Sequence, residues 1–115
     1  MQRDPDLYRQ LLLALGDAHP ISQGLCVVHV QERETGAVEY QAHLLKDAGL
    51  IELRQAMGIS LTARLTDKGH DFLEKIADDT VWSSMKAKAG DKLAGLPFDA
   101  IGTLAVEVAK RFFAL

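Results

Sequence analysis

The residues with the greatest potential for chemistry are four histidines, a single cysteine and a pair of adjacent aspartates. Cys26 and His29 have a spacing that could supply two ligands to a metal ion. In a β-strand, however, an odd separation places two side chains on opposite faces, and no second pair of ligands accompanies them. We therefore predict no metal site and no cofactor.

His70 and Asp71 follow Gly69 and could be read as part of a catalytic site. No nucleophile lies at a spacing from them that is typical of a catalytic motif, and the sequence contains no glycine-rich phosphate-binding loop. His70 is expected in the first turn of a helix, where a surface or capping role is the simpler interpretation. We predict that the chain has no catalytic residues and is not an enzyme.

Cations and polar side chains between residues 33 and 64 could instead contact the phosphates and base edges of double-stranded DNA. The DNA-binding candidates are Arg33, Thr35, His43, Lys46, Arg54 and Arg64. Four acidic residues on or beside the same predicted helix would repel phosphates. They are Glu32, Glu34, Glu39 and Asp47. A solvated helix face that binds nothing is the alternative interpretation.

The elements that would position these residues follow from capping and periodicity. Asp4 and Pro5 predict the start of a helix over residues 5–15, and the apolar residues 25–30 predict a short strand. A helix is expected over residues 32–48, then an antiparallel hairpin with strands over 50–54 and 59–65 and its turn at 56–58. Gln41 falls on the apolar side of that helix, so it is either a buried, hydrogen-bonded amide or a sign of a different register.

Three more helices are expected after the hairpin. Thr66 predicts the cap of the first, and the sequence Asp78-Asp79-Thr80 predicts a fresh cap, at Thr80, for the second, which weakens at Gly90 and ends at Gly95. Pro97 opens the last helix, over residues 98–114. Its apolar residues extend beyond one face, so it is either sandwiched between elements or covered by another subunit.

This order of elements predicts an α+β fold: a winged-helix-like domain of helix, short strand, helix and two-stranded wing, with a helical C-terminal extension. A full helix-turn-helix has another helix before the hairpin, which we expect to be reduced to a turn around Ser22 or Glu32. We predict one domain over residues 1–115, with residues 1–66 as the winged-helix-like part and residues 67–115 as the C-terminal helices.

Apolar residues in the last two helices have the spacing of core residues, and the alternative is an interface between the C-terminal helices of a homodimer. The dimer-interface candidates are Trp82, Val106, Phe112 and Phe113. A dimer would double the contacts with one duplex and could read a palindrome.

Composition narrows the class of protein further. The chain has 115 residues, of which 48% are hydrophobic and 25% charged, so it can bury a core without a disulfide or a metal. The net charge of −3 does not attract the protein as a whole to DNA, so DNA binding would need a local basic face. One cysteine, no signal-peptide pattern at the N-terminus and no membrane-spanning apolar run indicate a cytoplasmic protein without membrane association.

Several segments together also resemble a known family. They are Tyr40, Leu44-Leu45, Ala48-Gly49-Leu50-Ile51, Leu65-Thr66, Gly69-His70-Asp71-Phe72-Leu73 and Asp78-Asp79-Thr80-Val81-Trp82, with end segments at residues 3–7 and 95–98. The family comprises small bacterial and prophage-associated proteins with a domain of unknown function, DUF2513. The resemblance covers nearly the whole chain. It implies a winged helix extended by C-terminal helices and a bacterial or phage setting, without implying a reaction.

Our first hypothesis is therefore a small non-enzymatic DNA-binding or transcription-regulatory protein of bacterial or prophage origin. The alternative is a protein-protein interaction module that keeps the winged-helix fold and has a protein partner instead of DNA. The two hypotheses predict different surfaces around Thr35, His43, Lys46 and Arg64. A continuous positive area would favour DNA, whereas a neutral apolar area would favour a protein partner.

Overall fold

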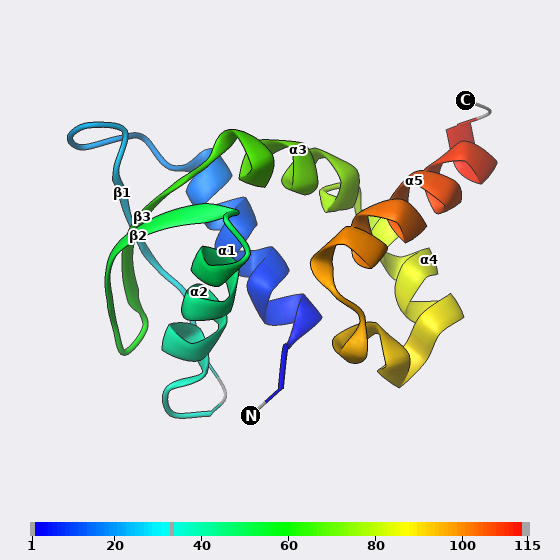
Figure 1. Ribbon diagram of the computed structural model, residues 1–115, viewed down its shortest axis with the longest axis horizontal. Coiled ribbons are helices and arrows are strands. Elements are labelled where there is room, and N and C mark those ends of the chain that lie inside the picture. Colours follow the sequence, from blue (N-terminus) through cyan, green and yellow to red (C-terminus); the bar gives the residue numbers. More distant parts are fainter. Residues whose placement is uncertain (1, 33, 114–115) are drawn as a thin grey trace.

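The computed structural model describes residues 2–32 and 34–113. In chain order the elements are α1 (Pro5–Asp17), β1 (Cys26–His29), α2 (Ala37–Asp47), β2 (Ile51–Met57), β3 (Ser60–Leu65), α3 (Asp67–Ile76), α4 (Asp79–Ala89), the 3-10 helix η1 (Gly90–Gly95) and α5 (Phe98–Phe113). The sheet lies at one end of the molecule and α4 and α5 at the other, with α1 and α3 between them (Figure 1). The predicted α+β class is confirmed.

The strands form an antiparallel three-stranded sheet in the order β1-β3-β2. In the central strand Leu61, Ala63 and Leu65 are buried, while the residues between them are partly exposed, as the alternation in the sequence predicts. α1 and α2 cover the buried face of the sheet, so the side chains between those three residues point to the opposite, outer face. The sheet therefore separates α2 from the outer face.

The helix before the hairpin is shorter than predicted, because it begins at Ala37 and not at residue 32. Gly36 has a φ angle of +82°, a left-handed conformation outside the α-helical range, so the helix begins only at the next residue. Glu32 instead acts as a side-chain cap, since its carboxylate accepts hydrogen bonds from the Val38 N–H at 2.8 Å and the Gly36 N–H at 3.4 Å.

The hairpin is longer and tighter than predicted. Met57 pairs with Ser60, which leaves Gly58 and Ile59 as a two-residue turn, and Gly58 has the positive φ angle of 56° that a type II′ turn needs at this position. β2 therefore extends through most of the segment where the sequence predicted the turn, and β3 begins one residue later than predicted.

Capping of the C-terminal helices agrees with the sequence in one of two places. The Thr66 hydroxyl accepts a hydrogen bond from the Gly69 N–H at 3.0 Å, as predicted for the N-cap of α3. The prediction of Thr80 as the next cap is wrong, because Asp78 accepts from the Val81 N–H at 3.0 Å and caps α4. An aspartate two positions earlier meets the same need, so α4 starts earlier than predicted.

Gln41 is the buried polar side chain of the core, and both ends of its amide are hydrogen-bonded. Its Nε2 donates to the Gln2 carbonyl, and its Oε1 accepts from the Asp4 N–H, each at 2.9 Å. The first alternative for Gln41, a buried and satisfied amide, is therefore confirmed. Its role is to hold the segment before α1 against α2.

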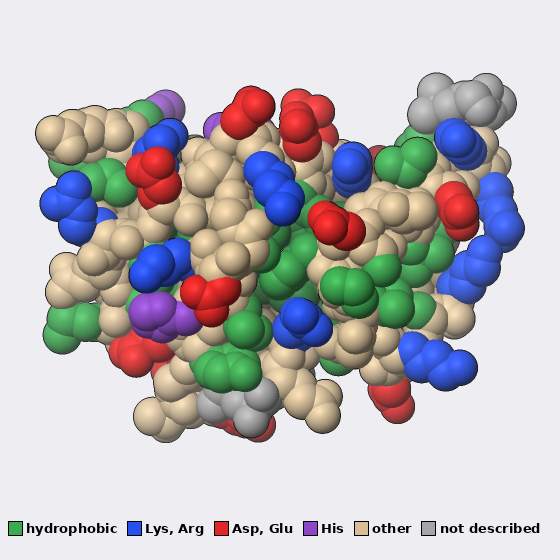
Figure 2. Space-filling view, in the orientation of Figure 1, with side chains coloured by type: hydrophobic (Ala, Val, Ile, Leu, Met, Phe, Trp, Pro, Cys, Tyr) green, Lys and Arg blue, Asp and Glu red, His purple; other side chains and the backbone are tan. Residues whose placement is uncertain are grey.

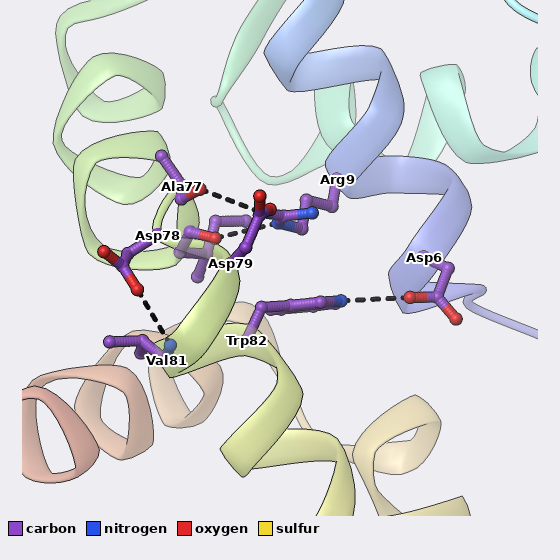
Figure 3. A network of polar contacts seen from close by, with 8 residues as sticks. Asp6, Arg9, Ala77, Asp78, Asp79, Val81 and Trp82 are labelled. Atoms are coloured by element: carbon purple, nitrogen blue, oxygen red, sulfur yellow. Dashed lines mark hydrogen bonds and ion pairs between the residues drawn. The ribbon is translucent and has the colours of Figure 1, made fainter.

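The C-terminal helices are joined to α1 by a polar network around Arg9 (Figure 3). Arg9 donates to the carbonyls of Ile76 and Ala77 at 2.9 and 2.8 Å and to the Asp79 carboxylate at 2.7 Å. Its guanidinium also lies 5.4 Å from the centroid of the Trp82 ring. One side chain of α1 thus fixes the junction between α3 and α4.

Asp6 makes a second connection between α1 and α4. Its carboxylate accepts from Trp82 Nε1 at 3.0 Å and pairs with Lys86 at 3.0 Å. Burial by itself would raise the pKa of Asp6. The hydrogen bonds from Trp82 and Lys86, with the positive charges of Lys86 and Arg9, outweigh burial and lower it.

Tyr8 places a hydroxyl in an aromatic cluster made by Phe72, Trp82 and Phe98. The hydroxyl is buried and has no hydrogen-bond partner among the described residues, and burial raises the pKa of the phenol well above its ordinary value. An unpaired buried hydroxyl costs about 1–3 kcal/mol. We expect Tyr8→Phe to leave the free energy of unfolding unchanged or to raise it by about 1 kcal/mol, as measured by urea denaturation.

Tyr8→Ala is the matched control for that substitution. It removes the ring as well as the hydroxyl, and we expect it to cost about 3–5 kcal/mol. A clear loss of stability in Tyr8→Phe would mean that the hydroxyl is hydrogen-bonded in solution.

Candidate nucleic-acid interface

The helix α2 and the hairpin tip form one continuous surface. Glu39 Oε1 accepts a hydrogen bond from the Gly58 N–H at 2.6 Å, which fixes the tip of the hairpin against the exposed side of the helix. We call this the α2–wing surface. It comprises Glu39, Tyr40, His43, Lys46 and Asp47 of α2 with Gly58 and Ile59 of the hairpin.

The structure brings only some of the predicted DNA-binding residues together. His43 and Lys46 are exposed on α2 and, at a separation of three residues, share one side of the helix. Thr35 is exposed but precedes α2, so its predicted place on the helix is wrong. Arg54 is exposed on β2, at the irregularity where the register with β3 shifts. Arg33 lies outside the described residues.

Arg64 is directed away from His43 and Lys46. Since Ala63 and Leu65 face α1 and α2, Arg64 belongs to the outer face of the sheet. There it makes a bidentate pair with Glu52 on the neighbouring strand, with Nε–Oε2 and Nη2–Oε1 distances of 2.8 and 2.6 Å. The hydrogen bonds from Arg64 lower the pKa of the Glu52 carboxyl, and Glu52 in turn raises the pKa of Arg64. A phosphate would have to displace this carboxylate.

The charges of the α2–wing surface are mixed. His43 and Lys46 lie between Glu39 and Asp47 along the exposed side of α2. Figure 2 shows basic, acidic and histidine side chains side by side over α2 and the hairpin, without a continuous positive area. Such a surface attracts a polyanion only weakly.

Apolar side chains also belong to this surface. Tyr40 is 39% exposed and Ile59, next to the tethered Gly58, is 47% exposed, whereas Met57 is 62% exposed on the outer face of the sheet. The sequence indicated none of these as functional. A large apolar residue beside a turn glycine was the available signal, because a tight turn exposes its flanking side chains.

The predicted dimer-interface residues fall into two groups. Trp82 is only 4% exposed and packs on Tyr8 and Arg9, so its interpretation as a core residue is correct and it cannot reach a partner. Val106, Phe112 and Phe113 are exposed on α5. These three remain available for an interface.

The residues considered for metal or catalytic chemistry are dispersed. Cys26 is buried and His29 exposed, on opposite faces of β1 as the odd spacing predicts, and His70 is exposed on α3. Within residues 2–32 and 34–113, no three His, Cys, Asp or Glu side chains are grouped to hold a metal ion. None of the helices in this part of the chain is long and apolar enough to cross a membrane.

The fold and this surface define a small α+β protein whose helices cover one face of a three-stranded antiparallel sheet. The chain belongs to the family described as "Hypothetical protein (DUF2513)", whose model matches residues 2–95, so the resemblance seen in the sequence is confirmed. It is also similar to an uncharacterized protein of Haemophilus influenzae strain Rd, at 36% identity over 118 residues, covering 99% of this chain and 100% of that protein. No solved structure matches the chain.

Proposed function

We propose that the chain is a small non-enzymatic winged-helix protein, of bacterial or prophage origin, that binds double-stranded DNA in a regulatory role. One observation carries the proposal: α2 leads directly into a hairpin whose tip is tied to it by the Glu39–Gly58 hydrogen bond, in a sheet of order β1-β3-β2. In winged-helix proteins the helix before the hairpin enters the major groove and the hairpin contacts the flanking backbone. In this chain α2 likewise precedes the hairpin and contacts its tip, which supports the proposal.

The α2–wing surface lacks a continuous positive area, so its electrostatics allow only weak binding of DNA by a single chain. Lys46 is exposed on the α2–wing surface and takes part in none of the ion pairs among the described residues, whereas Arg64 is held by Glu52 on the outer face. One phosphate contact corresponds to a slope of log K against log salt of about −1. The homodimer predicted from the sequence stays a prediction, and it would double the number of phosphate contacts.

Titration of a fluorescein-labelled mixed-sequence duplex, followed by anisotropy, tests the proposal. We expect saturable binding near about 50 mM salt that weakens with the slope given above. Lys46→Gln should reduce the magnitude of the slope by about 1, because one phosphate contact is lost. Glu39→Gln should tighten binding, because an amide oxygen still accepts from Gly58 but no longer repels phosphate.

Lys110→Gln is the matched control, since it removes one exposed cation from α5, far from the α2–wing surface, and should leave the slope unchanged. Absence of binding at low salt would refute DNA recognition. So would an equal response to Lys46→Gln and Lys110→Gln, because binding would then depend on net charge alone.

A protein partner on the same surface is the second candidate, favoured by the exposed Tyr40 and Ile59. Such a partner would bury these apolar side chains and tolerate the mixed charges around them. The two candidates differ in salt dependence, because burial of apolar area is much less sensitive to salt than contact with phosphates.

A further inference from the structure

The row of apolar residues on the buried side of α5 continues beyond the part of the helix that the other elements cover. Ile101, Ala105 and Val108 are buried on one side of the helix, and Phe112 follows Val108 by four residues on that same side. Phe112 is nevertheless 51% exposed. A large aromatic side chain at a core position is therefore covered by the protein on only part of its surface.

Phe112 borders a groove between α4 and α5 with a volume of about 360 Å³. The described residues that line it are Ser84, Ala87, Lys88, Val108, Arg111 and Phe112. Apolar side chains and two cations share this lining, and no acidic residue is among those described. The groove can therefore accept an apolar side chain of a ligand, and its two cations can pair with a negative charge next to that side chain.

The charge of this region contrasts with the rest of the chain. Residues 80–113 contain five lysines and arginines and three acidic residues, a balance of +2, whereas residues 1–79 contain eight and 13, a balance of −5. None of the ion pairs among the described residues involves Lys88 or Arg111. Figure 2 shows Lys and Arg side chains gathered along the edge formed by α4 and the end of α5.

We propose that the groove between α4 and α5 binds an acidic amphipathic helix of a partner protein. The apolar side of that helix would pack on Val108 and Phe112, and its carboxylates would pair with Lys88 and Arg111. This surface is distinct from the α2–wing surface, and the inference does not depend on DNA binding.

Two other occupants fit less well. A second copy related by a twofold axis through the groove would bring Lys88 and Arg111 against the same residues of its partner, which is repulsive. Single-stranded nucleic acid would need aromatic rings that stack successive bases, but Phe112 and Phe113 are neighbours in a helix and point in different directions.

The test uses the full chain and two labelled amphipathic peptides. Both carry leucine and phenylalanine at i, i+3, i+4 and i+7; the remaining positions of one are mostly glutamate, and those of the other mostly lysine. We expect the acidic peptide to bind at least about tenfold more tightly than the basic one, by anisotropy. Phe112→Ser and Arg111→Glu should each weaken binding of the acidic peptide by at least about fivefold.

Ile21→Ser is the control, because it removes a 73% exposed apolar side chain far from the groove and should leave binding unchanged. Thermal unfolding of each variant checks that the fold persists. We expect Phe112→Ser to stay folded, because Phe112 is half exposed. Equal binding of the two peptides, or no binding of the acidic one, would overturn the proposal. A dimer of the wild-type chain that Phe112→Ser converts to monomer would also overturn it, by identifying a second copy as the occupant.

Discussion

Gly69→Ala is expected to destabilise the protein by about 3 kcal/mol, although alanine normally strengthens a helix. Gly69 lies in the first turn of α3, with its Cα against the backbone of Leu50, at the start of the hairpin. A Cβ atom added there would overlap the Leu50 carbonyl oxygen and lie 2.9 Å from the carbonyl carbon. That oxygen also accepts the Thr66 N–H, so it cannot move without loss of this hydrogen bond.

The consequence extends to the hairpin, because Leu50 and Thr66 are the residues where its two strands meet the flanking helices. The Thr66 hydroxyl also donates to the Gly49 carbonyl at 2.6 Å. Displacing Leu50 would therefore loosen both ends of the hairpin and, with them, the position of α2. A thermal unfolding experiment should show a midpoint lower by about 12 °C, at about 4 °C for each kcal/mol.

Gly102→Ala is the matched control. Gly102 is also a buried helical glycine, but its added Cβ would meet the Lys75 side chain at 3.4 Å, and a flexible lysine can move. The gain in helix propensity should then dominate, and stability should stay equal or rise by up to about 1 kcal/mol. Equal losses in the two variants would show that the contact with Leu50 is not the cause.

Much of the fold could be predicted because its determinants are local. Asp4 and Thr66 cap their helices as their side chains and positions indicate, and alternation identifies the faces of β3. The wrong cap at Thr80 has a longer-range cause. Two suitable cap residues stand close together, and the choice depends on where α3 ends, which Arg9 fixes from a distant part of the chain.

The candidate interface was predicted less well, because it depends on which elements share a face. The pattern around Arg64 showed that this residue faces opposite to Ala63 and Leu65. It did not show that α2 packs on the side of Ala63 and Leu65, which places Arg64 away from Lys46. The Glu39–Gly58 hydrogen bond joins residues 19 positions apart, and no local rule indicates it.

The groove at α5 shows the same limit. Periodicity grouped Phe112 with the core residues Ile101 and Val108, but Phe112 is 51% exposed, so its interpretation as a core residue is wrong. Its exposure depends on where the neighbouring helices stop. α4 ends at Ala89 and the chain turns through Gly90 into η1, so the end of α5 remains partly uncovered.

Arg9→Met is expected to cost about 3 kcal/mol, because it removes the donor that satisfies the end of α3. Methionine keeps an apolar side chain of similar length but leaves the carbonyls of Ile76 and Ala77 without their hydrogen bonds. The Arg9 side chain is only 13% exposed, so water replaces these bonds poorly. The loss of the cation–π contact with Trp82 adds to the cost, and urea denaturation should show a lower midpoint with an unchanged slope.

Two companion variants separate the carbonyl bonds from the ion pair. Asp79→Asn removes the charge partner of Arg9, but the Asp79 side chain is 93% exposed, so we expect a loss below about 1 kcal/mol. Arg9→Lys keeps the charge but should show most of the loss expected for Arg9→Met, because a single ammonium group cannot reproduce the fork of the guanidinium. If Asp79→Asn instead proved as costly as Arg9→Met, the junction between α3 and α4 would depend on the exposed ion pair. The network of Figure 3 would then hold the C-terminal helices by charge, and high salt should weaken their attachment to α1.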